Sequence, residues 1–307
     1  GICGSQLGEI DGKKGKDPYI PHLMGHEGCG EVLAIGPGVK TIEVGNKVVL
    51  HWKRGSGIQS ETPKYKWRGR DLNAGSVTTF NEFAVVSENR CTSISKDISN
   101  DDAALFGCAV TTAFGVVENN AKLRLGESVI ICGAGGIGLN IIQASKLISA
   151  WPIIAVDIFD NRLELAKKFG ATHTINSRSE NLEIAVNKII EKKSLDVFID
   201  NTGIPEIIEK GYELTNSKGR VILVGVPPKD SNIKIYSLPL HFGKIILGSH
   251  GGECIPDKDI PRYMKLLTHK KISFKGLVTE RYKLDDINIA INKMRSGSSS
   301  GRIVIDL

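Results

Sequence analysis

The clearest chemical motif in the sequence is a glycine array, CGAGGIG, which places Gly133, Gly135 and Gly138 in G-x-G-x-x-G spacing. The array follows a segment that predicts a strand and opens one that predicts a helix, as a dinucleotide-binding turn requires. Gly133 would allow the tight turn, Gly135 would let a pyrophosphate approach the backbone, and Gly138 would let helix and strand pack closely. The N–H groups of the first helical turn, which includes Gly136 and Ile137, would then bind the phosphates.

An acidic residue follows this array at the distance that dinucleotide-binding folds use. Asp157 ends the next predicted strand, 19 residues after Gly138, and its carboxylate could accept hydrogen bonds from both hydroxyls of an adenosine ribose. The same negative charge would repel a 2′-phosphate, so we expect NAD as the cofactor in preference to NADP. Arg162 would cover the ribose or the adenine edge. The alternative is that Asp157 only caps the end of its strand.

Residues that could bind a metal are far apart in the sequence. The six cysteines form no paired framework, which in a chain of this size indicates a reducing compartment with free or metal-bound thiols. A single cysteine is usually a small buried hydrophobic residue, and a single histidine such as His26 could simply bond to a turn. The residues alone therefore leave a metal site open. The cysteines are Cys3, Cys29, Cys91, Cys108, Cys132 and Cys254.

Three zones of the chain must position these residues. In residues 1–109, the segments EGCGEVLAIGPGV, NKVVLHW and TTFNEFAVVSENRCTSI predict strands of a barrel-like β domain, and KRGSGIQSETPKYKWRGRDLNAG predicts a long polar loop. Residues 110–250 alternate Ile/Val-rich strands with helices, which predicts an α/β fold with a doubly wound parallel sheet. Residues 251–307 contain two amphipathic helices and end in GRIVIDL, a strand expected to return to the first zone.

Length and composition limit the class of protein. A chain of 307 residues with 41% hydrophobic and 24% charged residues predicts a globular protein of two domains. The net charge of +6 is scattered, which favours a solvated surface over nucleic-acid binding. No apolar run of about 18 residues and no leader segment is present, so we expect a cytoplasmic protein without membrane attachment.

The order of several motifs resembles the medium-chain zinc-dependent alcohol dehydrogenase family. GICGS is followed by GHEGCGEV, NKVVLHW, FGCAVTTAFG, GAGGIG and GRIVIDL, so the resemblance covers almost the whole chain. Its most specific parts are GHE-x-x-G and the cysteine-bearing segment ahead of the glycine array. The resemblance implies a GroES-like catalytic domain formed by residues 1–109 and 251–307, and a Rossmann NAD-binding domain formed by residues 110–250.

The resemblance also implies a set of site residues. One catalytic zinc would be held by Cys3, His26 and Cys108, with a fourth position left open. Glu27 resembles the acidic neighbour of the metal, and Ser5 resembles the hydroxyl that contacts the substrate oxygen and passes its proton onward. Further positions match the nicotinamide neighbour Thr112, the carboxamide-binding segment Val224, Gly225 and Val226, the pyrophosphate ligand Arg302 and the wall of the substrate pocket, Trp52.

The sequence departs from the family pattern close to the implied metal. Gln6 stands where the family usually has an aspartate that supports the ligating histidine, so we expect weaker zinc retention or a shifted pH optimum. Gly4 and Gly8 stand where some members carry a phosphate-binding arginine and a relay histidine. His51 is a candidate for the proton relay, and the alternative is a buried structural histidine.

Two further departures concern whole segments. Residues 53–77 lack the four cysteines that bind a structural zinc in many relatives, so we predict no second zinc. This segment is basic, and is interpreted either as a solvated loop or as a rim that attracts an anionic substrate. The family normally has a few tens of residues of β structure before Cys3, so we expect the β domain to lack these strands and to have unpaired edges. The charged residues are Lys53, Arg54, Lys64, Lys66, Arg68 and Arg70 against Glu61 and Asp71.

The leading prediction is therefore a zinc-dependent enzyme that transfers hydride between an alcohol or polyol and NAD. A different class of function is a non-catalytic NAD-binding scaffold or sensor, which Gln6 favours, and a third is a zinc-free reductase of the same superfamily. We expect a small-molecule substrate, no nucleic-acid partner, and a homodimer or homotetramer. The subunits would associate through the sheet edge formed by GRVILVGVPP and KIILGSHGG.

Overall fold

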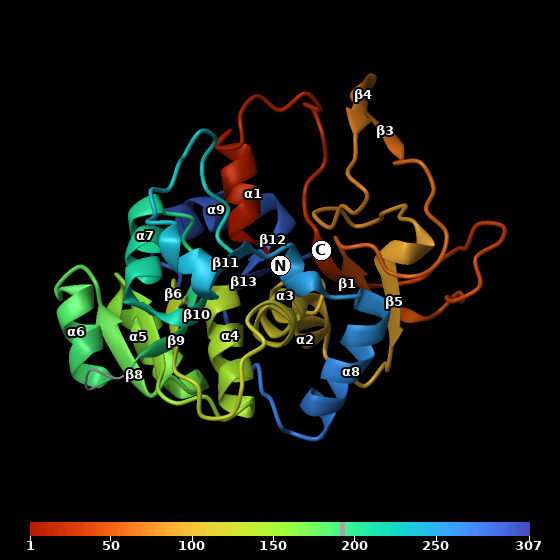
Figure 1. The fold of residues 1–307 in the computed structure, drawn as a ribbon. Helices are drawn as coiled ribbons and strands as arrows, with labels where there is room; N and C mark the ends of the chain where they lie inside the picture. The colour runs from red at the N-terminus through yellow and green to blue at the C-terminus, as the bar shows by residue number, and fades with distance from the viewer. Residues whose placement is uncertain (191–193) are drawn as a thin grey trace. The chain divides into compact units, whose positions relative to one another are not determined.

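The computed structural model describes residues 1–190 and 194–307 and divides the chain into two compact units (Figure 1). The first unit is formed by Gly1–Thr111 and Cys254–Leu307, and the second by Thr112–Glu253. The sequence-based boundaries were residues 109/110 and 250/251. The first unit is therefore discontinuous in sequence, and the second is inserted into it as one continuous segment.

The second unit is built on a six-stranded sheet in the order β11-β10-β9-β6-β7-β8, in which all neighbouring strands are parallel. The chain order reverses between β6 and β9, and ligands bind beyond the carboxyl ends of the strands at such a switch point. The predicted doubly wound α/β fold is confirmed. The strands are β6 (Val129–Cys132), β7 (Ile153–Asp157), β8 (His173–Asn176), β9 (Leu195–Asp200), β10 (Thr215–Leu223) and β11 (Ile245–Gly248).

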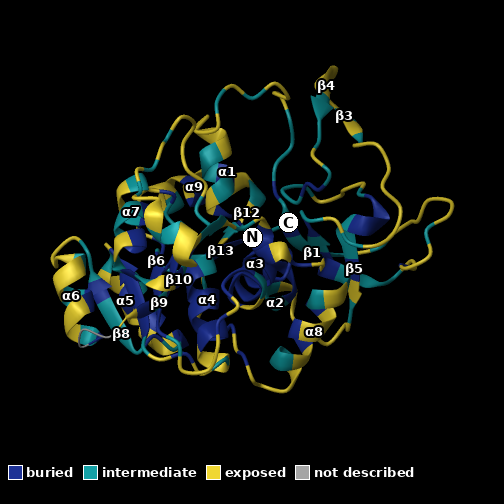
Figure 2. Ribbon diagram, viewed as in Figure 1, coloured by how far each residue is buried: buried dark blue, intermediate teal, exposed yellow. Residues whose placement is uncertain are grey.

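Four helices follow strands of this sheet, as the alternating pattern predicts. With these helices packed on the sheet, its central strands are buried, as Figure 2 shows, and Ile130, Ile154 and Phe198 are fully inaccessible to solvent. This burial on both faces explains why the strands are almost continuous runs of β-branched residues. The segment ENLEIAVNKIIEK, residues 180–192, also predicts a helix, and residues 191–192 lie outside the described part of the chain. The helices are α4 (Gly136–Leu147), α5 (Asp160–Phe169), α6 (Leu182–Ile189) and α7 (Pro205–Leu214).

The first unit contains an antiparallel sheet in the order β1-β2-β5, a β3–β4 hairpin and a parallel pair, β12–β13. Its strands are β1 (Glu27–Glu31), β2 (Lys47–His51), β3 (Lys64–Trp67), β4 (Arg70–Asn73), β5 (Cys91–Ile94), β12 (Val278–Lys283) and β13 (Arg302–Asp306). Its helices are α1 (Gly4–Ile10), α2 (Asn100–Leu105), α8 (Pro256–Thr268) and α9 (Ile287–Arg295), and α3 (Ala109–Gly115) crosses the boundary. The short helices of this unit are η1 (Glu88–Arg90) and η5 (Leu284–Asp286). Those of the second unit are η2 (Val116–Asn120, a π-helix), η3 (Leu238–Phe242) and η4 (Gly251–Glu253).

The prediction of a long polar loop over residues 53–75 was wrong in part, because this segment contains the β3–β4 hairpin. Its two-residue turn, Arg68 and Gly69, has positive φ at both positions, which matches the twist of the flanking strands. Opposite residues share a face, so Tyr65 lies beside Leu72 and gives one face a partly apolar character. Lys64 and Lys66 alternate with Tyr65 and Trp67 along β3. The two lysines made the segment read as a polar loop and hid the alternation of a strand.

One other strand prediction needs correction. The segment 78–94 is a strand only over β5, and Phe83 and Val85 are 71% and 65% exposed, because no strand in the described part of the chain pairs with residues 80–86. The final strand, β13, returns to the first zone as predicted, because residues 254–307 share a unit with residues 1–111 and the N–H of Ile2 donates to the carbonyl of Ile303 at 3.0 Å. The strand that it pairs with, β12, was not predicted.

A buried carboxylate ties together three loops of the first unit. Oε1 of Glu88 accepts the backbone N–H groups of Lys40 and Thr41, and Oε2 accepts that of Ile58, each at 2.8 Å. These hydrogen bonds, that of Ile58 first, lower the pKa of Glu88 from 4.5 to about 2. Since the folded-state pKa is depressed, this stabilisation is complete above pH 4.5 and is lost as the pH falls toward 2.

We expect Glu88→Gln to lower the free energy of unfolding at pH 7 by on the order of 1–2 kcal/mol, because the hydrogen bonds to the carboxylate lose its charge. The difference from the wild type should shrink markedly at pH 3, because the carboxylate of the unfolded wild type, with its ordinary pKa of 4.5, is then protonated and the unfolded state gains stability. Urea unfolding at both pH values measures this difference, with the exposed Glu82→Gln as the matched control. An equal loss at both pH values would contradict the role assigned to the Glu88 charge.

Among the described residues, no helix is both long and apolar enough to cross a bilayer.

Candidate functional site

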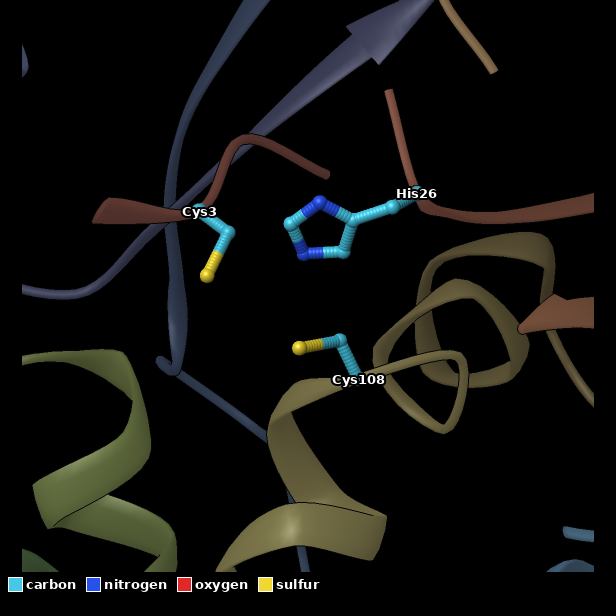
Figure 3. Close-up of side chains that lie close together, drawn as sticks. All are labelled: Cys3, His26 and Cys108. Carbon is cyan, nitrogen blue, oxygen red and sulfur yellow. The ribbon is translucent and has the colours of Figure 1, made fainter. Parts of the chain in front are cut away.

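Cys3, His26 and Cys108 are brought together in the first unit although they are far apart in sequence. Their ligand atoms all lie within 4.8 Å of one another, and Figure 3 shows the three side chains directed toward a common point. Both cysteines are buried and the imidazole is half-buried. Cys3 is the N-cap of α1, His26 directly precedes β1, and Cys108 lies between α2 and α3.

The electrostatic surroundings favour the thiolate form of Cys3. The hydrogen bond with Cys108 lowers the pKa of Cys3 well below its usual value. The hydrogen bond with His26 and the charges of His26 and Arg302 lower this pKa further, and together these effects outweigh burial, which raises it. The buried thiol of Cys132 behaves in the opposite way, because burial raises its pKa. Two cysteines and one imidazole around a shared point are the donor set of a catalytic zinc site. The residues present therefore fit a zinc ion, which two thiolates would neutralise.

Two glycines allow the metal-ligand segments to approach their neighbours. A Cβ on Gly107 would lie 2.3 Å from the carbonyl oxygen of Leu50 and 2.8 Å from Cα of Glu27, so the segment before Cys108 can contact β1 and β2 only without a side chain. Gly25, which precedes His26, has a φ of +95°. These positions give a structural reason for the glycines in FGC and GHE.

A buried ion pair lies beside the three ligands. Glu27 and Arg302 are 0% and 3% exposed, and their carboxylate and guanidinium groups are in direct contact. The other carboxylate oxygen of Glu27 accepts the N–H of Ala109 at 3.2 Å, next to Cys108. Burial lowers the pKa of Arg302, while the neighbouring Cys3 acts to raise it. The predicted role of Arg302 at the cofactor pyrophosphate stays a prediction.

Gln6 contacts the backbone of α1 and not the imidazole. Its amide oxygen accepts the backbone N–H of Cys3 at 3.0 Å and thereby caps α1. No hydrogen bond joins Gln6 to His26 within residues 1–190 and 194–307, so Gln6 does not take over the aspartate's support of the imidazole in this part of the chain. Ser5 is half-buried on the first turn of α1, two residues after Cys3, and its catalytic role stays a prediction.

His51 is a buried structural residue. Its Nδ1 lies 2.8 Å from the carbonyl oxygen of Lys53, and its Nε2 lies 2.9 Å from the hydroxyl of Thr92. Burial lowers the pKa of His51, so the ring is held neutral between two fixed partners. This arrangement favours the structural alternative over a proton relay. The adjacent Trp52 is half-buried, and its place in a substrate pocket stays a prediction.

The second unit contains the predicted dinucleotide-binding turn between β6 and α4. Gly133 has a φ of +88°, and a Cβ on Gly138 would lie 2.0 Å from the carbonyl oxygen of Gly133. Gly135 is the N-cap of α4, and a Cβ there would meet no atom within 4 Å. The turn therefore has the close packing that the glycine array predicts, with open space beside the helix N-terminus. Gly136 and Ile137 form the first turn of α4, whose N–H groups have no intrahelical acceptor.

Asp157 stands at the end of β7, directly against this turn. Its Oδ2 accepts the N–H of Ala134 at 2.8 Å, and its Oδ1 accepts the N–H groups of Ile158 and Phe159. Arg162 lies 3.8 Å from the carboxylate and stacks over the ring of Phe159. A carboxylate has about four acceptor positions, so one remains for a ribose hydroxyl. The residues present fit the adenosine end of a dinucleotide.

The segment predicted to bind the nicotinamide carboxamide, residues 224–226, lies near the end of β9. The N–H groups of Val224 and Gly225 both donate to the carbonyl of Asp200, at 2.8 and 2.9 Å, and Val226 is exposed. Sequence reasoning missed the buried side chain of Asp200, which binds the N–H groups of Thr202 and Gly203. Its position at the end of a strand beside the switch point was the available signal.

Thr112 opens the second unit, and its hydroxyl is buried without a hydrogen-bond partner in the described residues. A buried hydroxyl in this state leaves one donor and acceptor for a ligand atom. The contact of Thr112 with a nicotinamide stays a prediction.

Comparison with families of known proteins matches most of the chain. A model described as an alcohol dehydrogenase GroES-like domain matches residues 1–96, and one described as a zinc-binding dehydrogenase matches residues 136–269.

Individual proteins are similar along nearly the whole chain. Alcohol dehydrogenase 6 of Peromyscus maniculatus is 30% identical over 328 residues, covering 97% of this chain and 86% of the relative. S-(hydroxymethyl)glutathione dehydrogenase of Paracoccus denitrificans is 28% identical over 349 residues, covering 99% and 90%. The crystal structure of benzyl alcohol dehydrogenase from Acinetobacter calcoaceticus superimposes with a TM-score of 0.89 at 30% identity, covering 100% of this chain and 89% of that one.

Proposed function

Because the chain belongs to the medium-chain zinc-dependent alcohol dehydrogenase family, we propose that it transfers hydride between an alcohol or polyol and NAD. The observation that carries this proposal is the convergence of Cys3, His26 and Cys108 in the first unit. Neither a scaffold nor a zinc-free reductase needs two thiols and an imidazole directed at one point. The relatives support an oxidoreductase acting on alcohols, and the choice of substrate and of NAD is our proposal.

The residues of this chain would divide the reaction between them. Cys3, His26 and Cys108 would hold one zinc ion, which when bound supplies a Lewis acid that lowers the pKa of an adjacent hydroxyl. The hydroxyl of Ser5 would accept the proton of the substrate alcohol and pass it toward solvent. The ion pair of Glu27 and Arg302 would hold one negative and one positive charge in place beside the three ligands, since both side chains are buried.

The second unit would hold the acceptor of the hydride. NAD, when bound, supplies that acceptor, and the turn at Gly133–Gly138 would orient its phosphates through the first N–H groups of α4. Asp157 would bind the adenosine ribose and exclude a 2′-phosphate by charge repulsion. Thr112 and the segment 224–226 would position the nicotinamide end. These roles rest on the close packing of the glycine turn and on the acceptor position left on Asp157.

The substrate class can be narrowed by charge. The β3–β4 hairpin and its flanks carry six basic and two acidic residues between positions 53 and 71, which would attract an anionic alcohol. Several relatives are named for S-(hydroxymethyl)glutathione, which is such an anion. This compound therefore belongs in the test beside benzyl alcohol, simple alcohols and polyols.

The decisive experiment measures NADH formation with this panel of alcohols, using NAD and NADP in parallel. We expect turnover with NAD and with at least one member of the panel. Binding of NADH without turnover of any alcohol would overturn the proposal and support a non-catalytic NAD-binding protein.

The cofactor preference is tested by Asp157→Ser. We expect the KM for NAD to rise by about tenfold, since one charged hydrogen bond to the ribose is lost, and the activity with NADP relative to NAD to increase. Asp160→Ser is the matched control, because Asp160 is exposed at the start of α5 in the same loop. An unchanged ratio between the two cofactors would show that Asp157 does not select NAD.

We also propose a homodimer or homotetramer in the cytoplasm. The sheet of the second unit ends at β11, where Ile245 is exposed and has no further strand beside it in the described residues. A second copy of β11 could continue the sheet there. Sedimentation of the purified protein with and without Ile245→Lys would test this association.

A further inference from the structure

A second group of potential metal ligands lies in the first unit, away from the cysteines. Nε2 of His22 is 2.7 Å from Oδ2 of Asp17 and 3.7 Å from Oε1 of Glu9, and the three ligand atoms lie within 4.8 Å of one another. We call these residues the Glu9–Asp17–His22 cluster. Glu9 lies on the last turn of α1, and the other two residues lie in the segment between α1 and β1. The side chains of His22 and Asp17 are 14% and 17% exposed, and that of Glu9 is 43% exposed.

The backbone fixes which nitrogen of His22 faces the carboxylates. Nδ1 lies 2.8 Å from the carbonyl oxygen of Leu23, which can only accept a hydrogen bond, so Nδ1 must carry the proton. In the neutral ring the lone pair then belongs to Nε2, which is directed at Asp17. Metal-ligating histidines are commonly held in this way, with the other ring nitrogen donating to a backbone carbonyl.

The cluster places two carboxylates around one imidazole. The pKa of His22 is raised, because the hydrogen bonds to Leu23 and Asp17 and the charges of Asp17 and Glu9 outweigh burial. A proton therefore joins Nε2 to Oδ2 of Asp17 at 2.7 Å, with a second carboxylate nearby. The nearby lysines Lys13, Lys14 and Lys16 form no ion pair with either carboxylate within the described residues. A divalent cation shared by the three groups would replace the proton between His22 and Asp17 and balance the charge of both carboxylates.

The positions of the ligands are supported from outside the cluster. Oδ1 of Asp17 accepts the N–H of Tyr19 at 2.8 Å, which leaves Oδ2 directed at His22. The segment is also bound to β4, because Asn73 accepts the N–H of Leu23 and donates to the carbonyls of Pro21 and Tyr19. Two of the three ligands are therefore held in place before any ion binds.

From this geometry we propose that the Glu9–Asp17–His22 cluster binds one divalent transition-metal ion of the Zn²⁺ or Co²⁺ type. One imidazole and two carboxylates suit these borderline cations better than Cu⁺, which prefers sulfur, or Ca²⁺, which prefers oxygen alone. Nε2 and Oδ2 would move apart from 2.7 Å to roughly 3.0–3.4 Å to share one ion at bond lengths of about 2.1 Å. Water would occupy the remaining positions on the exposed side of Glu9.

The location of this cluster indicates a structural role for the ion. The segment that it would close, from Glu9 to His22, lies between Cys3 and His26, and α1 carries Cys3 at one end and Glu9 at the other. A metal at the cluster would therefore restrain both chain segments that bring ligands to the cysteine site. The effect of this restraint on catalysis rests on the proposed function, whereas metal binding to the cluster does not depend on it.

The test uses the full chain with zinc already bound at the cysteine site, titrated with Co²⁺ by calorimetry and absorption spectroscopy. We expect about one further equivalent of cobalt, with weak d–d bands and without the sulfur-to-cobalt charge-transfer band that cysteine ligands produce. His22→Gln and Asp17→Asn should keep their zinc and weaken cobalt binding at least tenfold. His269→Gln, at an exposed histidine of the same unit, should bind cobalt as the wild type does.

Several outcomes would overturn the proposal. These are the absence of a second equivalent at saturating Co²⁺, cobalt binding that survives both substitutions, or a sulfur charge-transfer band that assigns the cobalt to the cysteines. In the first case His22 and Asp17 form only a protonated ion pair. Circular dichroism shows whether each variant is folded, and Asp17→Asn keeps an oxygen for the N–H of Tyr19 if His22→Gln does not fold. Turnover is not used as a readout, so failure of the proposed function would not affect this test.

Discussion

Replacing Cys108 with serine is expected to reduce turnover by about a thousandfold or more and to lower bound zinc from about one ion per chain to nearly none. A serine hydroxyl is a far poorer zinc ligand than a thiolate, and the two remaining ligands cannot close the site. Plasma mass spectrometry of the purified protein measures the zinc, and NADH formation measures the turnover. Binding of NADH, which depends on the second unit, should change little.

Cys29→Ser is the matched control for this substitution. Cys29 lies in β1, where its sulfur donates weakly to Asn100, and a serine hydroxyl can make the same contact. This variant should keep both zinc and turnover. Zinc that remains bound to Cys108→Ser, or wild-type protein that folds and turns over without zinc, would contradict the assignment of the three ligands.

Replacing Glu27 with alanine is expected to lower the free energy of unfolding by about 3–5 kcal/mol, because the guanidinium of Arg302 would remain buried without its partner. The N–H of Ala109 would also lose its acceptor. Urea unfolding measures the loss. Zinc content should fall as well, since Ala109 directly follows Cys108 and its backbone would no longer be held.

Two comparisons separate the buried charge from a general effect of truncation. Glu280→Ala removes the partner of the partly exposed Lys293 and should lower the free energy of unfolding far less, because solvent screens an exposed ion pair. The double variant Glu27→Ala with Arg302→Met removes both charges and should recover part of the stability. If Glu27→Ala lowers the free energy of unfolding no more than Glu280→Ala does, the buried ion pair does not stabilise the fold as predicted. If Glu27→Ala does not fold, Glu27→Gln provides the same comparison.

Sequence reasoning succeeded where a function needs local spacing. The glycines at 133, 135 and 138 must stand in one order to build the turn, so their pattern is visible in a single segment. The proposed metal ligands are different, because Cys3, His26 and Cys108 meet only through the fold. Their residue types alone did not distinguish a site from ordinary core residues, and the order of motifs along the chain was needed.

The features that were missed depend on tertiary contacts. Glu88 receives hydrogen bonds from residues 30 to 48 positions away, and nothing in the local sequence marks it as buried. Gln6 stands at the motif position of the histidine-supporting aspartate, but its amide oxygen accepts the backbone N–H of Cys3, a contact that the motif does not reveal. The strand predicted over residues 80–86 shows the same limit, since an alternating pattern forms a strand only where a neighbour pairs with it.

The ribosome completes the second unit, which ends at Glu253, before it has made β13. About 190 residues separate Cys108 from Arg302, so at 5–20 residues per second the zinc ligands exist for roughly 10 to 40 s before the cation that neutralises Glu27. In the last part of that interval, after Glu253, the second unit is complete, whereas the first unit still lacks β13 and a buried charge. A premature stop codon near position 302 would therefore damage a proposed site whose ligands lie far upstream, at positions 3, 26 and 108.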